Sequence, residues 1–457
     1  MALVSEPSLF MQGQLNDPKL IRAWTMYDWA ISVYNLVIAT TFFPIYFLSV
    51  TKAFYGEDTV PLLGRTFKNT SLYNYTLSVA YLFIALLLPI LSSIADSSGR
   101  KKSFMKFFCY MGGLACIGMF WFSGQNVGWG VLCLMVAAIG YVGSLVFYNS
   151  YLPEICTTDQ MDSVSARGFA MGYTGAVILQ MIGFGLVIYF TGQNPPDKTS
   201  GPLFTFVLTG LWWIGFAQIP FALLHDKKVH HSSNTNFLSK GFKELGKVWV
   251  QIKKLVLLRW FLFAFFFYSM GVQTIMLVTS MFGSRVLKLA NTNLIITLVI
   301  VQLVGIVGAM LTARVSRRFG NLNVLTSMVL LWILVCVFAY EVANISESGV
   351  NVEYHFYGLA VCVGLVMGGI QALSRSTYGK LMPETKDTAS FFSFYDVTEK
   401  VAIVIGIFSF GYIDELFGMK NSVLALVVFF ALGLFSLLIA RAKQGGGNSP
   451  SSNSGGA

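Results

Sequence analysis

Apolar segments of membrane-spanning length recur along the whole chain and are separated by short polar turns. Each is close to the roughly 20 residues that an α-helix needs to cross the hydrocarbon core of a bilayer. Apolar and polar residues do not alternate at every second position, as they would in the strands of a membrane β-barrel. The pattern therefore predicts an all-α, polytopic membrane protein with twelve transmembrane helices. We place these helices near residues 22–50, 72–95, 103–123, 128–151, 167–191, 203–224, 257–282, 291–312, 322–343, 355–376, 392–414 and 421–441.

Two basic turns occupy corresponding places in the two halves of the chain. The first, at 96–102, reads Asp-Ser-Ser-Gly-Arg-Lys-Lys, and the second, at 314–320, reads Arg-Val-Ser-Arg-Arg-Phe-Gly. Their glycines are 221 residues apart, which is about half the chain. A Pro-Glu pair at 153–154 returns at 383–384 with a similar spacing. We therefore predict two related six-helix halves, a plan known from secondary transporters.

Polar segments surround and separate these halves. We expect a cytoplasmic N-terminus, an N-terminal six-helix half, a cytoplasmic basic linker, a C-terminal six-helix half and a disordered tail, at residues 1–21, 22–224, 225–256, 257–441 and 442–457. Within the linker, apolar residues recur at helical spacing among lysines. That arrangement predicts a basic amphipathic helix lying on the inner membrane surface.

Composition agrees with a membrane protein and argues against a soluble one. Of the 457 residues, 55% are hydrophobic and 11% are charged, whereas soluble domains carry roughly 25% charged residues. The net charge of +10 comes from basic residues in short turns, so we expect a topology signal and no binding to nucleic acid. With the N-terminus inside, 23 Lys and Arg residues face the cytoplasm and 7 face outward. This asymmetry predicts that both termini are cytoplasmic.

Several functional classes are not expected. The sequence has no nucleotide-binding P-loop, no nucleophile elbow and no zinc-protease motif, so we expect neither an enzyme nor a cofactor. The six cysteines form no CxxC pair, and we expect no disulfide framework and no metal site. The expected partners are the lipid bilayer, a small-molecule substrate and a proton or other ion gradient. We expect a monomer in a cell (inner) membrane rather than in a vacuolar or lysosomal membrane.

Three of the predicted helices carry polar or charged residues on one face. An ionisable residue within a membrane helix is costly, which makes it a functional candidate by default. The faces lie on helices 22–50, 355–376 and 392–414. We predict substrate or coupling roles for seven of these residues: Asp28, Asn35, Gln371, Arg375, Asp396, Glu399 and Lys400.

The roles of the charged residues are left open by the sequence. Asp28 is either a proton carrier or gate, or a carboxylate near enough to the cytoplasmic interface to stay hydrated. Asp396 and Lys400 are i, i+4 neighbours that could pair, within a substrate path or within an ion-pair network that holds the inner gate. Arg375 could hold a carboxylate, from the substrate or from Glu399, or could extend to the lipid headgroups.

The basic turn also carries a family resemblance. Residues 92–101 read Ser-Ser-Ile-Ala-Asp-Ser-Ser-Gly-Arg-Lys, which resembles the major facilitator superfamily turn Gly-x-Leu-Ala-Asp-Arg-x-Gly-Arg-Arg/Lys. The departures are Ser92 and Ser97. The resemblance implies a major facilitator fold, and it implies conformational gating by Asp96, Gly99, Arg100 and Lys101. It further implies that Asp96 latches the turn against the start of the eleventh helix when the outside is open. The second turn has Arg317 in the Asp position, so we expect it to lack the same latch.

Other stretches resemble one branch of this superfamily, the vacuolar amino-acid effluxer (autophagy-related) branch. They are Trp-Thr-Met-Tyr-Asp-Trp-Ala at 24–30, Pro-Ile-Tyr-Phe at 44–47, Gln-Ala-Leu-Ser-Arg-Ser at 371–376 and Phe-Phe-Ser-Phe-Tyr at 391–395. Ile31 stands where the branch often has Asn. The resemblance implies alternating-access transport, with amino acids as the leading substrate.

The sequence therefore predicts a secondary active transporter that moves an amino acid or related metabolite, with efflux as one direction and a proton gradient as the driving force. Two alternatives share the fold, because fold alone does not fix function. One is a membrane receptor or scaffold, which would not need polar groups in the membrane. The other is a lipid flippase, which transport of lipid rather than of small solutes would reveal.

Overall fold

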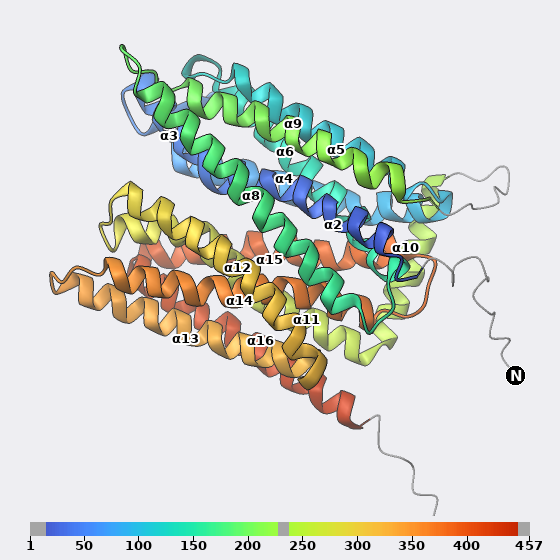
Figure 1. The fold of residues 1–457 in the computed structure, drawn as a ribbon. Coiled ribbons are helices and arrows are strands. Elements are labelled where there is room, and N and C mark those ends of the chain that lie inside the picture. The colour runs from blue at the N-terminus through green and yellow to red at the C-terminus, as the bar shows by residue number, and fades with distance from the viewer. Residues whose placement is uncertain (1–14, 227–236, 447–457) are drawn as a thin grey trace, which may run out of the picture.

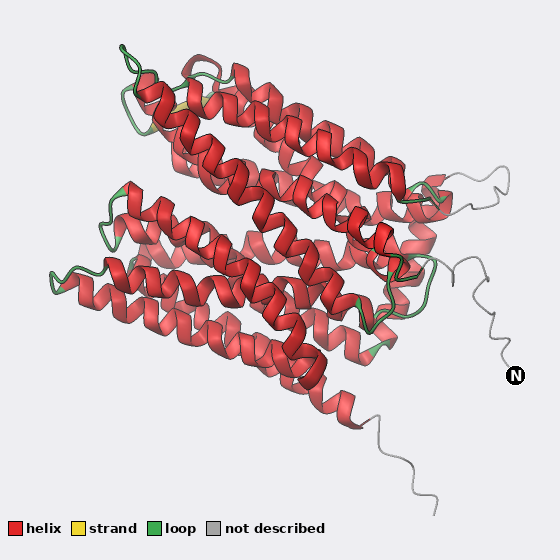
Figure 2. Ribbon diagram, viewed as in Figure 1, coloured by secondary structure: helices red, strands yellow, loops and turns green. Residues whose placement is uncertain are grey.

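Twelve long helices run through the part of the chain that the structure describes, residues 15–226 and 237–446 (Figures 1 and 2). The structure is a computed structural model. The first long helix is continuous through α2 (Pro18–Val33), η1 (Tyr34–Phe42) and α3 (Phe43–Tyr55). The others are α4 (Asn69–Ser98), α5 (Lys101–Gly118), α6 (Val127–Ser150), α8 (Met161–Thr191), α9 (Ser200–Leu223), α11 (Val256–Arg285), α12 (Asn291–Phe319), α13 (Asn321–Glu347), α14 (Glu353–Leu381), α15 (Thr388–Phe417) and α16 (Met419–Gly446).

Several further elements connect the twelve helices, and all but the linker helix α10 are short. They are β1 (Thr59–Leu62), β2 (Arg65–Lys68), η2 (Met119–Trp121), η3 (Gly124–Asn126), α7 (Leu152–Ile155) and α10 (Phe237–Lys254). The two strands form an antiparallel hairpin between α3 and α4, which the apolar pattern did not predict. The predicted linker helix is confirmed as α10, whose Val248 and Ile252 are buried. It packs against α4 and α15, and its position on a membrane surface stays a prediction.

The all-α membrane fold is confirmed. Eleven of the described helices are long and apolar enough to cross a membrane. The twelfth long helix, α15, does not stand out by composition because it carries charges near its middle and at its end. Several of the long helices extend a turn or more beyond the predicted segments, since their polar ends continue past the apolar stretch.

The ends of the chain differ in part from expectation. The predicted disordered tail is wrong for residues 442–446, because α16 continues to Gly446. The rest of the tail (447–457), the first fourteen residues and linker residues 227–236 lie outside the described residues. At the other end α2 begins at Pro18, four residues before the predicted start. Asp17 Oδ1 accepts a hydrogen bond from Lys19 N (2.8 Å), and Pro18 fills the first helical position.

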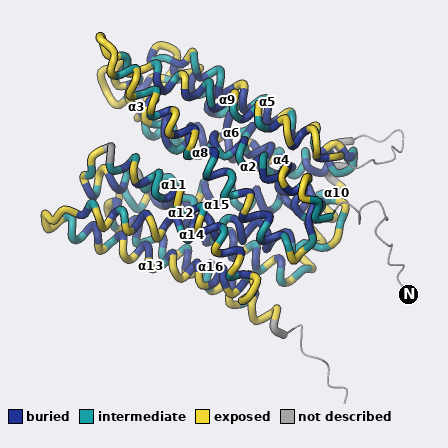
Figure 3. The backbone as a smooth tube through the Cα atoms, in the orientation of Figure 1, coloured by how far each residue is buried: buried dark blue, intermediate teal, exposed yellow. Residues whose placement is uncertain are grey.

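The long helices gather into two groups. Figure 1 shows the helices from α2 to α9 on one side and those from α11 to α16 on the other. Helix α8 packs against α12 and α14 of the second group, and α15 packs against α4 and α6 of the first. Figure 3 shows buried residues along these facing surfaces and many exposed residues on the outer ones. Large exposed side chains such as Leu86 and Phe408 are apolar, as expected for surfaces that face lipid.

The first long helix changes its hydrogen-bond pattern midway. Segment η1 is a π-helix, and Asn35 lies in its first turn. Short π segments inside α-helices occur frequently at functional sites, because they change which side chains face a given direction. The apolar pattern of this segment contains no sign of the change.

Candidate functional site

A central cavity of about 1110 Å³, counting the part open to solvent, lies between the two groups of helices. Its walls come from α2, η1, α4, α6 and α8 on one side and from α11, α14 and α15 on the other. All seven residues predicted to act in substrate binding or coupling line this cavity: Asp28, Asn35, Gln371, Arg375, Asp396, Glu399 and Lys400. The three polar faces therefore meet, although the chain separates the first from the last by more than 350 residues.

A buried ion pair joins the two groups across the cavity wall. Arg375 Nη2 on α14 lies 3.0 Å from Asp28 Oδ2 on α2, and both side chains are at least 95% buried. Tyr148 donates its hydroxyl to the same Oδ2 at 2.6 Å. Asp28 is thus not hydrated at an interface, and Arg375 neither pairs with Glu399 nor reaches the lipid headgroups.

Helix α8 completes the surroundings of Arg375. Its Nε donates to Ser165 Oγ and its Nη2 to Ser165 O, each at 2.9 Å. The guanidinium lies 4.3 Å from the centre of the Phe169 ring and 4.7 Å from that of Trp24, an arrangement favoured by cation–π attraction. Gly168 leaves room for the pair, since a Cβ there would lie 2.2 Å from Asp28 Oδ2.

A second ion pair lies on α15. Lys400 Nζ lies 2.5 Å from Glu399 Oε2, and Gln273 Nε2 on α11 donates to Glu399 Oε1 at 2.8 Å. The expected pairing of Lys400 with Asp396 is therefore wrong. Glu399 is thus bound through both oxygens, by Gln273 at Oε1 and by Lys400 at Oε2.

Asp396 is the third carboxylate of the cavity, and its side chain is held differently. Its Oδ1 accepts a hydrogen bond from Asn149 Nδ2 at 3.5 Å, and its Oδ2 has no hydrogen-bond partner among the described residues. Asn149 Oδ1 accepts in turn from Arg375 Nη1 at 3.4 Å. One amide on α6 thus connects Asp396 with the Asp28–Arg375 pair.

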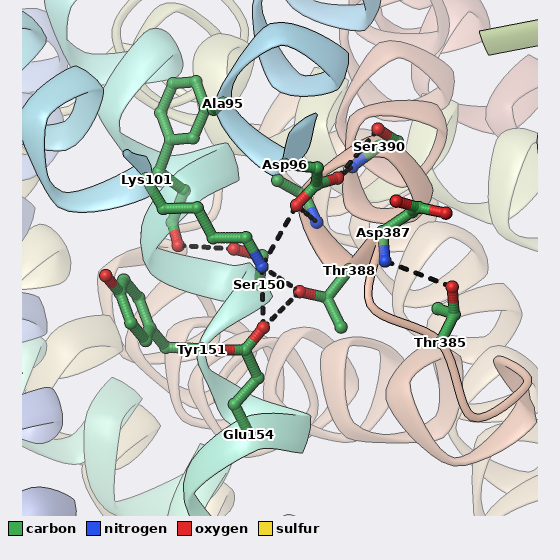
Figure 4. Close-up of polar contacts among 12 residues, drawn as sticks. Ala95, Asp96, Lys101, Ser150, Tyr151, Glu154, Thr385, Asp387, Thr388 and Ser390 are labelled. Carbon is green, nitrogen blue, oxygen red and sulfur yellow. Dashed lines mark hydrogen bonds and ion pairs between the residues drawn. The ribbon is translucent and has the colours of Figure 1, made fainter. Parts of the chain in front are cut away.

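The basic turn after α4 forms a contact that we call the first latch. Asp96 Oδ2 accepts hydrogen bonds from Ser390 N (2.7 Å) and Ser390 Oγ (2.8 Å), and its Oδ1 accepts from Ala389 N at 3.2 Å (Figure 4). These donors belong to the first turn of α15, where the helix dipole favours a negative charge. The contact between Asp96 and the start of the eleventh membrane helix, which the resemblance implied, is therefore present.

Lys101 closes the first latch. Its Nζ lies 3.1 Å from Asp96 Oδ1 and 2.6 Å from Glu154 Oε1, and it also donates to Thr388 (Figure 4). Gly99 ends α4 with φ of 65°, a left-handed conformation that glycine adopts without strain. Arg100 is exposed, so the structure separates it from the other predicted gating residues.

A second latch was not predicted. Asp162, in the first turn of α8, lies 2.6 Å from Lys380 Nζ through its Oδ2. Its Oδ1 accepts from Asn321 Nδ2 at 2.8 Å, and its Oδ2 also accepts from Ser316 Oγ at 3.1 Å. Ser316 lies within the second basic turn and Asn321 directly follows it, whereas Arg317 between them is exposed. The second turn is thus latched after all, by a carboxylate that comes from the other group of helices.

Comparison with known proteins places the chain in a family. Residues 16–448 match the sequence model of a family described as vacuole effluxer Atg22 like. The chain belongs to this family. The predicted resemblance is confirmed.

Relatives of this Atg22-like chain and a solved structure agree. It is 31% identical to a Bacillus subtilis (strain 168) protein described as an uncharacterized MFS-type transporter, over 91% of this chain and 93% of that one. It is 25% identical to autophagy-related protein 22 of Eremothecium gossypii, over 86% of this chain and 84% of that one. A major facilitator superfamily proton:xylose symporter has the same fold, with a TM-score of 0.68, 11% identity and coverage of 93% and 95%. The major facilitator fold is confirmed.

Several residues of the candidate site and the latches were not predicted from the sequence. They are uncharged or lie outside the predicted spans: Tyr148, Asn149, Asp162, Ser165 and Gly168. Asp162 was overlooked because the predicted helix began at residue 167, five residues later. Asn149 offered a usable signal, since it is an amide in a predicted membrane helix.

Proposed function

We propose that this Atg22-like protein is a secondary active transporter, without enzymatic activity, that moves a small solute by alternating access. The observation that carries the proposal is the Asp28–Arg375 pair, which joins the two groups of helices at the wall of the central cavity. Removing one partner of a buried ion pair costs about 3–5 kcal/mol. A cargo or an ion that competes for either partner would therefore change how firmly the two groups are held together.

The two latches suggest which state of the cycle this is. Both lie at the end of the molecule that the distribution of Lys and Arg assigns to the cytoplasm. With that assignment both termini are cytoplasmic, and the structure corresponds to a state closed toward the cytoplasm. In the proposed cycle both latches and the Asp28–Arg375 pair open as the cavity turns inward. We propose further that the protein works as a monomer and lies in the cell membrane.

An amino acid or a related metabolite fits the cavity as cargo. The walls present ionised groups of both signs, such as Glu399 and Lys400, next to the aromatic rings of Tyr81, Tyr268 and Tyr395. A zwitterion with an apolar side chain can use both kinds of surface. The family is described as a vacuole effluxer, which supports export of the solute as the direction of transport. A proton gradient is the proposed driving force.

The proposal is tested with purified protein in proteoliposomes and a panel of radiolabelled amino acids with apolar, acidic and basic side chains. We expect saturable uptake of one group of these that a pH gradient accelerates. The Asp28→Asn variant should fold normally and lose nearly all of this uptake, because Arg375 keeps its position but loses its charged partner. Initial rates at equal reconstituted protein provide the measurement.

A matched control is Glu347→Gln, which removes a carboxylate from the pair with Lys420, where Glu347 is exposed. It should transport like the wild type. Movement of labelled lipid with no movement of solute would instead identify a flippase. Tight binding of a solute without turnover would identify a receptor.

A further inference from the structure

Of the three carboxylates that line the cavity, Asp396 alone lacks a cationic partner among the described residues. Asp28 is paired with Arg375, and Glu399 is paired with Lys400. Asp396 is 2% exposed, yet no Lys or Arg nitrogen of the described residues lies within ion-pair distance of it. A buried carboxylate without a counter-ion is costly when ionised, because burial removes the water that stabilises the charge.

The two oxygens of Asp396 have different surroundings. Oδ1 accepts the long hydrogen bond from Asn149, while Oδ2 has no hydrogen-bond partner among the described residues and belongs to a side chain that lines the cavity. Buried polar atoms in folded proteins are nearly always hydrogen-bonded, so an exception calls for an explanation. An oxygen left open beside a solvent-connected cavity can take up a proton or another positive group.

The polar and charged groups that face Asp396 come from three helices, α15, α14 and α6. Its own helix supplies Glu399 and Lys400, and α14 supplies Arg375. Uncharged polar groups near it are Asn149 from α6, Tyr378 from α14 and Tyr395 from α15. Tyr81 from α4 and Tyr268 from α11 line the same cavity. With the carboxyl groups, Arg375 and Lys400 all ionised, the described groups lining the cavity have a net charge of −1. One added positive charge makes the cavity neutral.

We propose that Asp396 Oδ2 is the proton-binding site that couples this transporter to a proton gradient. A hydronium ion in the cavity gives its proton to Oδ2, so that one O–H bond breaks, one O–H bond forms and a water molecule is left. The ionised cavity groups then sum to zero charge. A proton suits the site because the oxygen is buried and needs no space for a larger ligand. The proposal rests on the proposed function, and it assigns to Asp28 a different task, which is to hold Arg375.

Asn149 links the proposed proton site to the Asp28–Arg375 pair that joins the two groups of helices. Its Nδ2 donates to Asp396 and its Oδ1 accepts from Arg375 Nη1. A neutral carboxylic acid is a weaker hydrogen-bond acceptor than a carboxylate. Protonation of Asp396 therefore loosens the amide from α15, and the amide in turn changes its hold on the arginine that joins the two groups of helices. Proton binding and opening are thereby connected through one side chain.

Infrared difference spectroscopy tests the site without any substrate. Wild-type protein in lipid nanodiscs is titrated from about pH 9 to about pH 6.5, a range in which exposed carboxylates stay almost fully ionised. We expect a carboxylic-acid C=O band to appear on acidification, to be absent from Asp396→Asn, and to persist in Asp28→Asn and Glu399→Gln. A band that persists in Asp396→Asn, or that never appears in the wild type, overturns the proposal. Gel filtration and thermal unfolding confirm that each variant is folded.

Transport by the same proteins separates coupling from binding. In proteoliposomes Asp396→Asn should still exchange labelled for unlabelled amino acid, while accumulation driven by a pH gradient falls to the level of protein-free liposomes. Loss of exchange together with accumulation would assign Asp396 to the cationic group of the substrate and overturn the proposal. If the wild type transports no amino acid, the proposed function fails, and the infrared titration still decides whether Asp396 binds the proton.

Discussion

The two latches close the same end of the molecule with opposite distributions of charge. In the first, the carboxylate lies beside the basic turn: Asp96 at the end of α4 reaches the first turn of α15. In the second, the carboxylate lies on the receiving helix: Asp162 at the start of α8 reaches Ser316 and Asn321 around the second turn. The two halves thus make a contact at corresponding places, but the carboxylate of that contact comes from a different partner in each.

Each latch has one lysine, and the two lysine side chains differ in how far they are shielded from water. Lys101 is 6% exposed and binds Asp96 and Glu154 together, whereas Lys380 is 24% exposed beside Asp162. Asp96 also accepts two backbone N–H groups at a helix start, while the partners of Asp162 are all side chains. Backbone donors at a helix start keep their positions, and side chains can turn to water. We therefore expect the first latch to be the stronger one.

Removal of the charge of the first latch should have the largest effect. In Asp96→Asn the first turn of α15 loses a carboxylate that accepts three hydrogen bonds, and each bond to a charged group contributes about 1.5–3 kcal/mol. We expect initial transport rates in proteoliposomes to fall by about tenfold or more. Spin-label distances across the end that carries the latches should lengthen at the same time. An unchanged distance would mean that the latch does not hold this end closed.

Removal of the charge of the second latch should have a smaller effect. In Asp162→Asn the amide oxygen can still accept from Asn321, and the amide NH2 can donate to the Ser316 hydroxyl, so the main loss is the partly exposed pair with Lys380. We expect a loss of about 1 kcal/mol, which corresponds to a rate reduced about fivefold. The same rate and distance measurements apply. A larger effect than that of Asp96→Asn would reverse the proposed order of the two latches.

The comparison also shows where sequence reasoning succeeds. The charges of the cavity were recognisable because Asp28, Asp396, Glu399 and Lys400 interrupt strongly apolar stretches, where an ionisable residue is rare. The first latch was recognisable because its turn has a known pattern and its partner helix, α15, could be named from the family. Fold class and helix number follow from apolar segment length, which is a local property of the chain.

The pairing of these charges could not be predicted in the same way. Asp28 and Arg375 are 347 residues apart, and only the packing of α2 against its neighbours decides that they meet. Spacing along α15 suggested that Lys400 pairs with Asp396, but Gln273 on another helix fixes Glu399 beside it instead. Asp162 stayed hidden because polar first turns lie outside the apolar stretches that mark a membrane helix.

The smallest effect should come from the residue that occupies the Asp position in the second turn. Arg317 is exposed, and the hydrogen bonds and ion pair of the second latch do not involve it. Surface substitutions of this kind usually change stability by less than about 0.5 kcal/mol. We therefore expect Arg317→Gln to change the transport rate by less than about twofold, a result that compares directly with the two aspartate variants.

Arg318→Gln is the matched control for that experiment, because it removes an equally exposed charge from the same turn. Similar small effects at both positions would show that the second turn contributes only positive charge to membrane orientation. A loss in Arg317→Gln as large as in Asp96→Asn, with Arg318→Gln unaffected, would show that the position itself takes part in gating. In that case the two turns would act alike. The position of the carboxylate, on the turn in the first latch and on the receiving helix in the second, would then not be what distinguishes the latches.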